Sequence, residues 1–179
     1  MNRLTTIANL ADAPEASAAV FAGIKKAMGR VPNAYATVGT HSPAALGAAL
    51  NGDAILAKSS LSKPDVEAIK LAVSEIAGCD YCIAAHTLVG KMVGLSLEET
   101  RQVRAGVATG NAQRDALVAF VRHVVSTHGT VDKARLDEVR AAGYSEAQVI
   151  DALFAVSVIT FTNLVNRVND TDLDFPAVE

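Results

Sequence analysis

The sequence predicts an all-α protein, a bundle of about seven to nine helices. Apolar residues recur at helical spacing along most of the chain, and the breaks between these stretches carry helix caps rather than strand turns. No stretch has the pattern of a convincing strand. The chain has 179 residues, about one domain's worth, and half of them are apolar, enough to bury a sizeable core. We therefore expect a single domain over residues 1–179.

The expected helices follow from their caps, in chain order. A proline or a polar N-cap residue opens most of them, and a glycine often follows the last turn. Ser62, Ser96 and Ser145 are each followed three residues later by Asp, Glu or Gln, the pattern of a capping box. The expected segments are about 15–28, 33–38, 43–57 and 63–77, one that opens at Cys79, one after Ser96, then about 112–127, 132–142 and 146–168.

The last expected helix, about 146–168, is apolar nearly all round. It is either the central helix of the bundle, or another subunit covers one of its faces. Phe161, Leu164 and Val168 continue one stripe along it. Both arrangements remain open, and the second makes the protein a homo-oligomer.

The net charge and the length of the apolar runs limit the classes of partner that we expect. The net charge is −3, from 16 basic and 19 acidic residues without a basic block, so neither nucleic acid nor an anionic membrane surface is an expected partner. No run reaches the roughly 20 apolar residues that span a bilayer. We expect a cytoplasmic protein that acts on small molecules or other chains. In that compartment thiols stay reduced, so a close cysteine pair is more often catalytic or metal-binding than structural.

Both cysteines of the chain lie in one short motif, and a histidine follows them. Cys79 and Cys82 form a CxxC, and His86 comes four residues after the second cysteine. Gly78 ends the preceding helix, so the thiols are expected in the first turn of the next one, with all three side chains within one stripe. A helix N-terminus or a nearby imidazole favours the reactive thiolate, and the three-residue spacing allows a reversible disulfide. We therefore expect a redox core at about 61–95.

Two carboxylates are candidates to complete the site. Glu67 lies on the preceding helix, and a helical hairpin would fold it back toward His86, where a carboxylate orients the imidazole. Glu75 shares the stripe of the cysteines only if the helix continues through Gly78. For either residue, a solvated surface position is the plain alternative. Tyr81 is a further candidate for lining the site.

The segment Glu67-x11-Cys79-Asp-Tyr-Cys82-x3-His86 resembles the signature of the alkylhydroperoxidase D-like branch of the carboxymuconolactone decarboxylase superfamily. The resemblance is strongest between Leu61 and Leu95 and extends to the tail, which is similar to that of peroxidase-related members. It implies an all-α fold, a homo-oligomer such as a trimer or hexamer, and a lipoyl-linked thiol peroxidase.

By this resemblance Cys82 attacks a hydroperoxide, Cys79 resolves the sulfenic acid as a disulfide, and His86 with Glu67 forms the proton relay. No bound cofactor or metal is implied; the electron donor is a dithiol, such as a lipoyl-bearing protein. The sequence departs from the best characterised branch at Tyr81, where that branch has histidine.

Two questions stay open at this stage. Helix-terminus electrostatics favour Cys79 as the thiol of lower pKa, whereas His86 and the resemblance favour Cys82 as the attacking sulfur. We expect Cys82 to attack, because a base can remove its proton during the reaction.

Two other functions are alternatives to a peroxidase. One is a zinc-binding module built from Cys79, Cys82, His86 and a glutamate. The other is a carboxymuconolactone decarboxylase-like lyase, although the decarboxylase branch lacks the CxxC.

Overall fold

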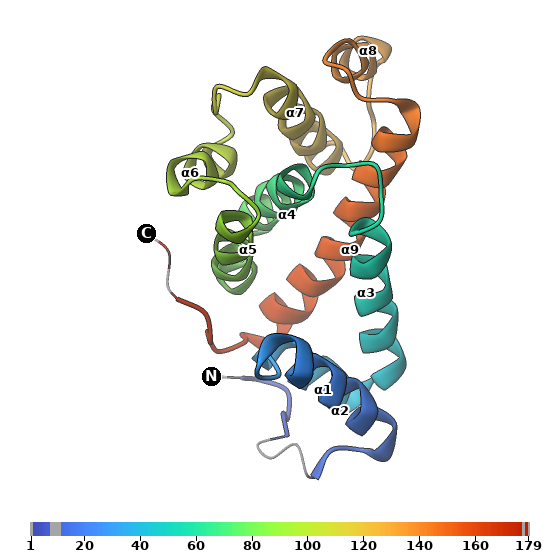
Figure 1. Ribbon diagram of the computed structural model, residues 1–179, viewed down its shortest axis with the longest axis vertical. Coiled ribbons are helices and arrows are strands. Elements are labelled where there is room, and N and C mark those ends of the chain that lie inside the picture. Colours follow the sequence, from blue (N-terminus) through green and yellow to red (C-terminus); the bar gives the residue numbers. More distant parts are fainter. Residues whose placement is uncertain (1, 8–11, 177, 179) are drawn as a thin grey trace.

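The structure, a computed structural model, describes residues 2–7, 12–176 and 178. These residues form nine α-helices and no strand (Figure 1), which confirms the all-α prediction. The helices are α1 (Glu15–Met28), α2 (Asn33–His41), α3 (Pro43–Leu56), α4 (Lys63–Ala77), α5 (Asp80–Met92), α6 (Leu97–Ala105), α7 (Ala112–Ser126), α8 (Lys133–Ala141) and α9 (Glu146–Asn169).

The predicted caps form at the helix starts. Ser96 and Ser145 each make a complete capping box, while the Ser62 hydroxyl accepts a hydrogen bond from the Asp65 N–H at 3.2 Å. The short segment expected at 33–38 continues to His41 as α2. These local signals act within one turn of the chain, so they locate the helix starts well.

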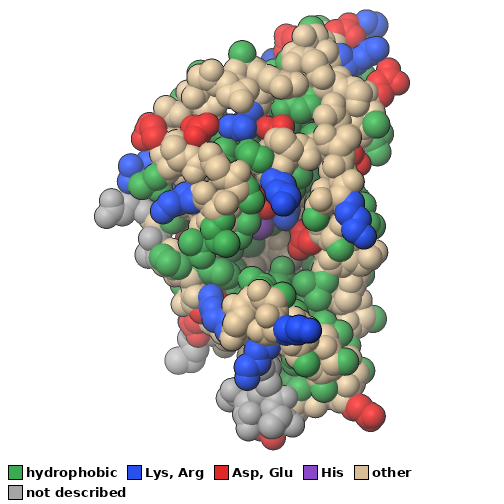
Figure 2. Space-filling model, in the orientation of Figure 1, with side chains coloured by type: hydrophobic (Ala, Val, Ile, Leu, Met, Phe, Trp, Pro, Cys, Tyr) green, Lys and Arg blue, Asp and Glu red, His purple; other side chains and the backbone are tan. Residues whose placement is uncertain are grey.

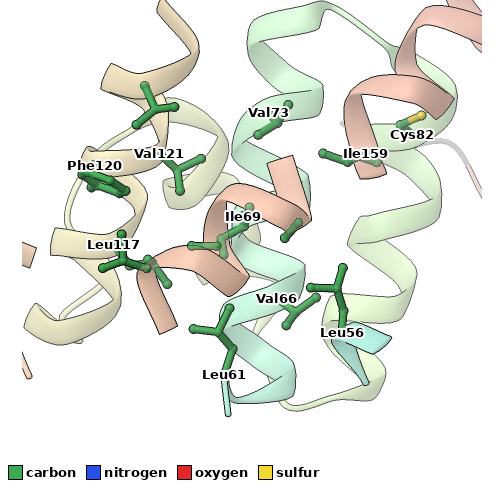
Figure 3. Close-up of a cluster of buried hydrophobic side chains, with 14 of the residues drawn as sticks. Leu56, Leu61, Val66, Ile69, Val73, Cys82, Leu117, Phe120, Val121 and Ile159 are labelled. Carbon is green, nitrogen blue, oxygen red and sulfur yellow. The ribbon is translucent and has the colours of Figure 1, made fainter. Parts of the chain in front are cut away.

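Helix α4 is the central helix of the fold. It packs against α5, α6, α7 and α9, and every residue from Val66 to Ser74 is buried. Its apolar side chains meet those of α7 and α9 in the main core, and Cys82 lies at the edge of this cluster (Figure 3). The hairpin of α4 and α5 therefore holds the cysteine motif against the main core.

Helix α9 is the longest and crosses the molecule from α8 to the α1–α2 end (Figure 1). Its buried stripe includes Ala152, Ile159 and Asn166. Its other side is apolar and exposed, and the exposed large side chains are Ile150, Leu153, Phe161, Leu164 and Val168. Of the two arrangements that the sequence left open, α4 and not α9 occupies the centre.

By length and composition alone, the 24-residue helix α9 is a candidate membrane span within the described residues. The expectation that no segment reaches this length of apolar sequence was therefore wrong. One such helix is weak evidence for a membrane, because a core helix of a soluble protein meets the same criterion.

Candidate active site

The turn between α4 and α5 places the two cysteines. Gly78 ends α4 in the left-handed conformation, with φ 61° and ψ 42°, and the Cys79 N–H donates to the Ser74 carbonyl at 3.0 Å. Arg167 of α9 donates to the carbonyls of Ala77 and Gly78, which are left without partners in the helix. Cys79 is then the N-cap of α5, and Cys82 lies in its first turn.

The two thiols are free, nearly buried and coupled to each other. Cys79 is 2% exposed and Cys82 is 3% exposed. The hydrogen bond between their side chains lowers the pKa of Cys79, against the effect of burial, and Arg167 adds to the lowering. The same hydrogen bond, together with burial, raises the pKa of Cys82 far above its usual value, although Asn166 and Thr162 partly oppose this. Of the two thiols, Cys79 is therefore the one with the lower pKa, and the main cause is its hydrogen bond with Cys82.

A chain of charged side chains reaches the cysteine helix from α3 and α4. The Nδ1 atom of His86 lies 2.7 Å from Oε2 of the buried Glu67. The other carboxylate oxygen of Glu67 lies 3.5 Å from the Nζ atom of Lys70, which donates to Asp53 at 2.9 Å. Burial alone would raise the pKa of Glu67, but His86 and Lys70 outweigh this effect and lower it. Glu67 is thus an ionised carboxylate that fixes the orientation of His86 and leaves its Nε2 atom for other contacts.

Cys82 and His86 share a small apolar cavity of about 100 Å³. It opens between α5 and the α1–α2 pair, where Figure 2 shows a hollowed surface bordered largely by hydrophobic side chains. Side chains of α9 and the C-terminal segment complete it. The lining consists of Met28, Pro32, Ala34, Tyr35, Tyr81, Cys82, Ala85, His86, Val89, Thr162, Asn166 and Phe175.

Cys79 lines a different cavity, which is larger and polar. Its volume is about 440 Å³, and its walls come from the α4–α5 turn, the end of α9 and both terminal segments. Cys82 and His86 are not part of its lining. The expectation that all three side chains share one face therefore holds for Cys82 and His86, whereas Cys79, as the N-cap, faces another space.

Tyr81 stands between the two cavities and lines both. Its hydroxyl donates to Asp174 at 2.7 Å and accepts from the Ala34 N–H at 3.2 Å. Its ring meets that of Phe175 edge to face, with the centroids 5.4 Å apart. Burial raises its pKa, so the side chain is a neutral, fixed wall.

Glu75 lies elsewhere. Its carboxylate accepts a hydrogen bond from Arg104 of α6 at 2.7 Å and lines neither cysteine cavity. The physical reason is the break at Gly78, since Glu75 would share the stripe of the cysteines only on a continuous helix.

Side chains outside the cysteine motif also reach the site. Tyr35 of α2 lines the Cys82 cavity, and burial with the nearby charges of Asp53 and Glu67 raises its pKa. Asn166 donates to the Cys82 sulfur at 3.3 Å, and its side-chain amide oxygen has no hydrogen-bond partner among the described residues. Lys70 gave one usable signal, its i+3 spacing from Glu67. Nothing in the sequence relates Asp53 or Tyr35 to the site.

The zinc alternative gains no support from this geometry. Within the part of the chain that the structure describes, no three His, Cys, Asp or Glu side chains are placed to hold a metal ion. Glu67 is engaged by His86 and Lys70 instead.

The model of the carboxymuconolactone decarboxylase family matches residues 43–122. This segment runs from α3 into α7 and contains Glu67, both cysteines and His86. A comparison with curated proteins gave no match.

Solved structures with the same fold cover nearly the whole chain. An uncharacterized peroxidase-related protein with the alkylhydroperoxidase AhpD core, from Ralstonia eutropha JMP134, is 19% identical with a TM-score of 0.84, over 97% of this chain and 92% of that one. A peroxidase-related protein from Silicibacter sp. TM1040 is 21% identical with a TM-score of 0.81, over 95% and 92%. The debrominase Bmp8 is 24% identical with a TM-score of 0.79, over 97% and 94%.

At these identities the structural comparison shows the fold, and the family match concerns the segment that carries the cysteine motif. The chain therefore has the AhpD-like all-α fold, and its residues 43–122 match the model of the carboxymuconolactone decarboxylase family.

Proposed function

We propose that the protein is a thiol-dependent peroxidase that reduces hydroperoxides through a dithiol/disulfide cycle of Cys79 and Cys82. One observation carries the proposal: Cys82 and His86 line the same small cavity, Glu67 lies 2.7 Å from the Nδ1 atom of His86, and Cys79 is one helical turn away from Cys82. A nucleophile, a base and a group that orients the base are the elements of an activated thiol site.

In the first step the Cys82 sulfur attacks the O–O bond of the peroxide. A sulfur–oxygen bond forms and the O–O bond breaks. His86 takes the thiol proton and passes it to the departing oxygen, which leaves as an alcohol. Glu67 is ionised and 2.7 Å from Nδ1, so it stabilises the imidazolium that forms in between.

In the second step Cys79 attacks the sulfenic acid on Cys82, and water leaves as the disulfide forms. The lowered pKa of Cys79 suits this role, because the attacking group is a thiolate. The raised pKa of Cys82 makes the proton transfer to His86 the step that activates it. A dithiol reductant then restores both thiols.

The size and lining of the cavity at Cys82 favour a small, partly apolar peroxide as the substrate. A volume of about 100 Å³ with walls such as Pro32, Val89 and Phe175 suits a short alkyl hydroperoxide better than a long lipid peroxide. Tyr35 and Asn166 are polar groups in the same lining that can hydrogen-bond to the peroxide oxygens.

The test is the consumption of tert-butyl hydroperoxide by the reduced protein with a panel of dithiol reductants. Wild type should turn over, and Cys82→Ser should not. After one exposure to peroxide, titratable thiols should fall by two per chain, the number of cysteines in the sequence, without an intermolecular cross-link. Unchanged thiol counts in wild type would refute the proposal.

A second candidate is the reductive removal of halogen from a small aromatic compound. Two observations favour it: the fold shared with the debrominase Bmp8 and the aromatic and apolar lining of the Cys82 cavity. The same thiol pair would supply the two electrons. Bromide release from 2,3,4-tribromopyrrole, measured beside peroxide consumption, separates the two activities.

We also propose that a second copy of the chain covers the exposed side of α9. The exposed row along α9 consists of Ile150, Leu153, Phe161, Leu164 and Val168. With Ser157 counted between Leu153 and Phe161, the intervals are three, four, four, three and four residues, as in a helix–helix seam. Several large apolar side chains in one exposed row are more typical of a subunit interface than of a free surface.

A further inference from the structure

The two cysteines are reached through different cavities. We propose that the larger cavity at Cys79 is the entrance and binding site for the reductant, a small uncharged dithiol, whereas the peroxide enters through the cavity at Cys82. This inference rests on the proposed peroxidase function and adds where, and from what class of molecule, the electrons come.

The linings of the two cavities overlap at only two residues, Tyr81 and Asn166. Tyr81 is held at its hydroxyl by Asp174 and by the backbone of Ala34, so it separates the two spaces as a fixed partition. Asn166 is buried and donates to the Cys82 sulfur at 3.3 Å. Each thiol is nearly buried, so the cavity that it lines is its approach for a reactant.

The linings of the two cavities differ in polarity, and each suits a different reactant. The cavity at Cys82 is mostly apolar, whereas the cavity at Cys79 has side chains of both charges, among them Arg3, Arg167, Asp80 and Asp170. Mixed charges at close range favour a polar molecule without net charge, bearing hydroxyl or amide groups. The volume of about 440 Å³ also leaves room for a dithiol that closes into a ring when it is oxidised.

The direction of attack supports the same assignment. A thiolate displaces one sulfur of a disulfide from the side opposite to the sulfur that leaves. Cys79 lines the larger cavity and Cys82 does not, so a reductant in that cavity attacks the Cys79 sulfur, and Cys82 is the sulfur that leaves.

The reaction then proceeds in two balanced steps. The first thiolate of the reductant forms a bond to the Cys79 sulfur, the Cys79–Cys82 bond breaks, and Cys82 leaves with the electron pair. Asn166 donates a hydrogen bond to that sulfur, and His86, in the same cavity as Cys82, supplies its proton. The second thiol of the reductant attacks the reductant's own sulfur in the mixed disulfide, and Cys79 leaves as a thiolate. The reductant departs as a cyclic disulfide. Arg167 and the start of α5 stabilise the departing Cys79 thiolate.

A pair of matched variants tests the inference. Leu173 lines the Cys79 cavity and is 47% exposed, and Met28 lines the Cys82 cavity and is 49% exposed. Replacing each by Trp narrows one entrance without removing a buried side chain. The two half-reactions are then followed separately by quenched thiol titration, oxidation with tert-butyl hydroperoxide and reduction of the isolated disulfide with dithiothreitol.

Leu173→Trp should slow reduction by about tenfold and leave oxidation nearly unchanged, and Met28→Trp should do the reverse, because about 1.4 kcal/mol of added barrier corresponds to a tenfold change in rate. Unaltered reduction in folded Leu173→Trp, or a loss of both half-reactions in Met28→Trp, would show that one entrance serves both reactants. Circular dichroism checks the fold, and Arg3→Trp at the same cavity replaces Leu173→Trp if that variant does not fold.

Failure of the peroxidase proposal gives a different result. Wild-type protein that tert-butyl hydroperoxide does not oxidise would refute the peroxidase function. The disulfide can then be formed with diamide, and its reduction by dithiothreitol still compares the two Trp variants.

Discussion

Replacing Glu67 by Gln should slow the oxidation of the thiols by peroxide about 10- to 100-fold. The carboxylate lies 2.7 Å from the Nδ1 atom of His86 and is its charge partner when the imidazole takes the thiol proton. Two unit charges about 4 Å apart attract by about 4 kcal/mol at an effective dielectric constant near 20. Gln keeps the hydrogen bond and loses the charge, so we expect a loss of about 1.4–2.7 kcal/mol, which gives the stated range of rates.

The same substitution should have little effect on stability. Lys70 keeps its hydrogen bond to Asp53 at 2.9 Å, so no buried cation loses its last partner, and the expected cost is about 1 kcal/mol. The folded protein lowers the pKa of Glu67, so the charge of this carboxylate stabilises the fold above the unfolded pKa, and this contribution is lost as the pH falls through the folded pKa. The difference in Tm between wild type and Glu67→Gln should therefore shrink in acid.

Glu75→Gln is the matched control, because Glu75 pairs with Arg104 and lines neither cysteine cavity. The assay is a single turnover with tert-butyl hydroperoxide, with free thiols titrated after rapid acid quenching. Glu75→Gln should react at nearly the wild-type rate. Equal rates for wild type and Glu67→Gln, or a larger defect in Glu75→Gln, would refute the relay through Glu67.

Three further predictions follow from the turn, the thiols and α9. Gly78→Ala should destabilise the fold by about 1–2 kcal/mol in urea unfolding. The left-handed φ of 61° is costly for alanine, and the added Cβ would lie 2.6 Å from the guanidinium of Arg167. An unchanged urea midpoint would contradict the turn geometry. Cys79→Ser treated with peroxide should accumulate a sulfenic acid that dimedone labels, and Cys82→Ser should not label; the reverse pattern would make Cys79 the attacking sulfur. Leu164→Glu should reduce the mass measured by light scattering to that of a single chain, without loss of helix content. Wild-type protein with the mass of a single chain would exclude the α9 interface.

Local signals explain why the helices could be predicted closely. N-cap serines, prolines in the first turn and glycines after the last turn act through hydrogen bonds within a few residues. The break at Gly78 is one such signal, and it correctly separated Glu67 from Glu75: the hairpin brings the first residue to His86, and the second stays on the outside. The motif of two cysteines and a histidine was visible for the same reason.

The sequence alone therefore determined the all-α class, the helix starts and the cysteine motif, because each depends on short-range geometry. It suggested the contact of Glu67 with His86 and left Glu75 as an alternative, and the packing of α4 against α5 decided between them. Only the tertiary structure decided which helix is central, that Asp53 and Lys70 extend the charged chain, and that Tyr35 lines the Cys82 cavity. It also placed the two thiols on separate cavities. These features depend on how α2, α3, α9 and the C-terminal segment pack around α4 and α5, and no spacing along the chain encodes contacts between elements that lie dozens of residues apart.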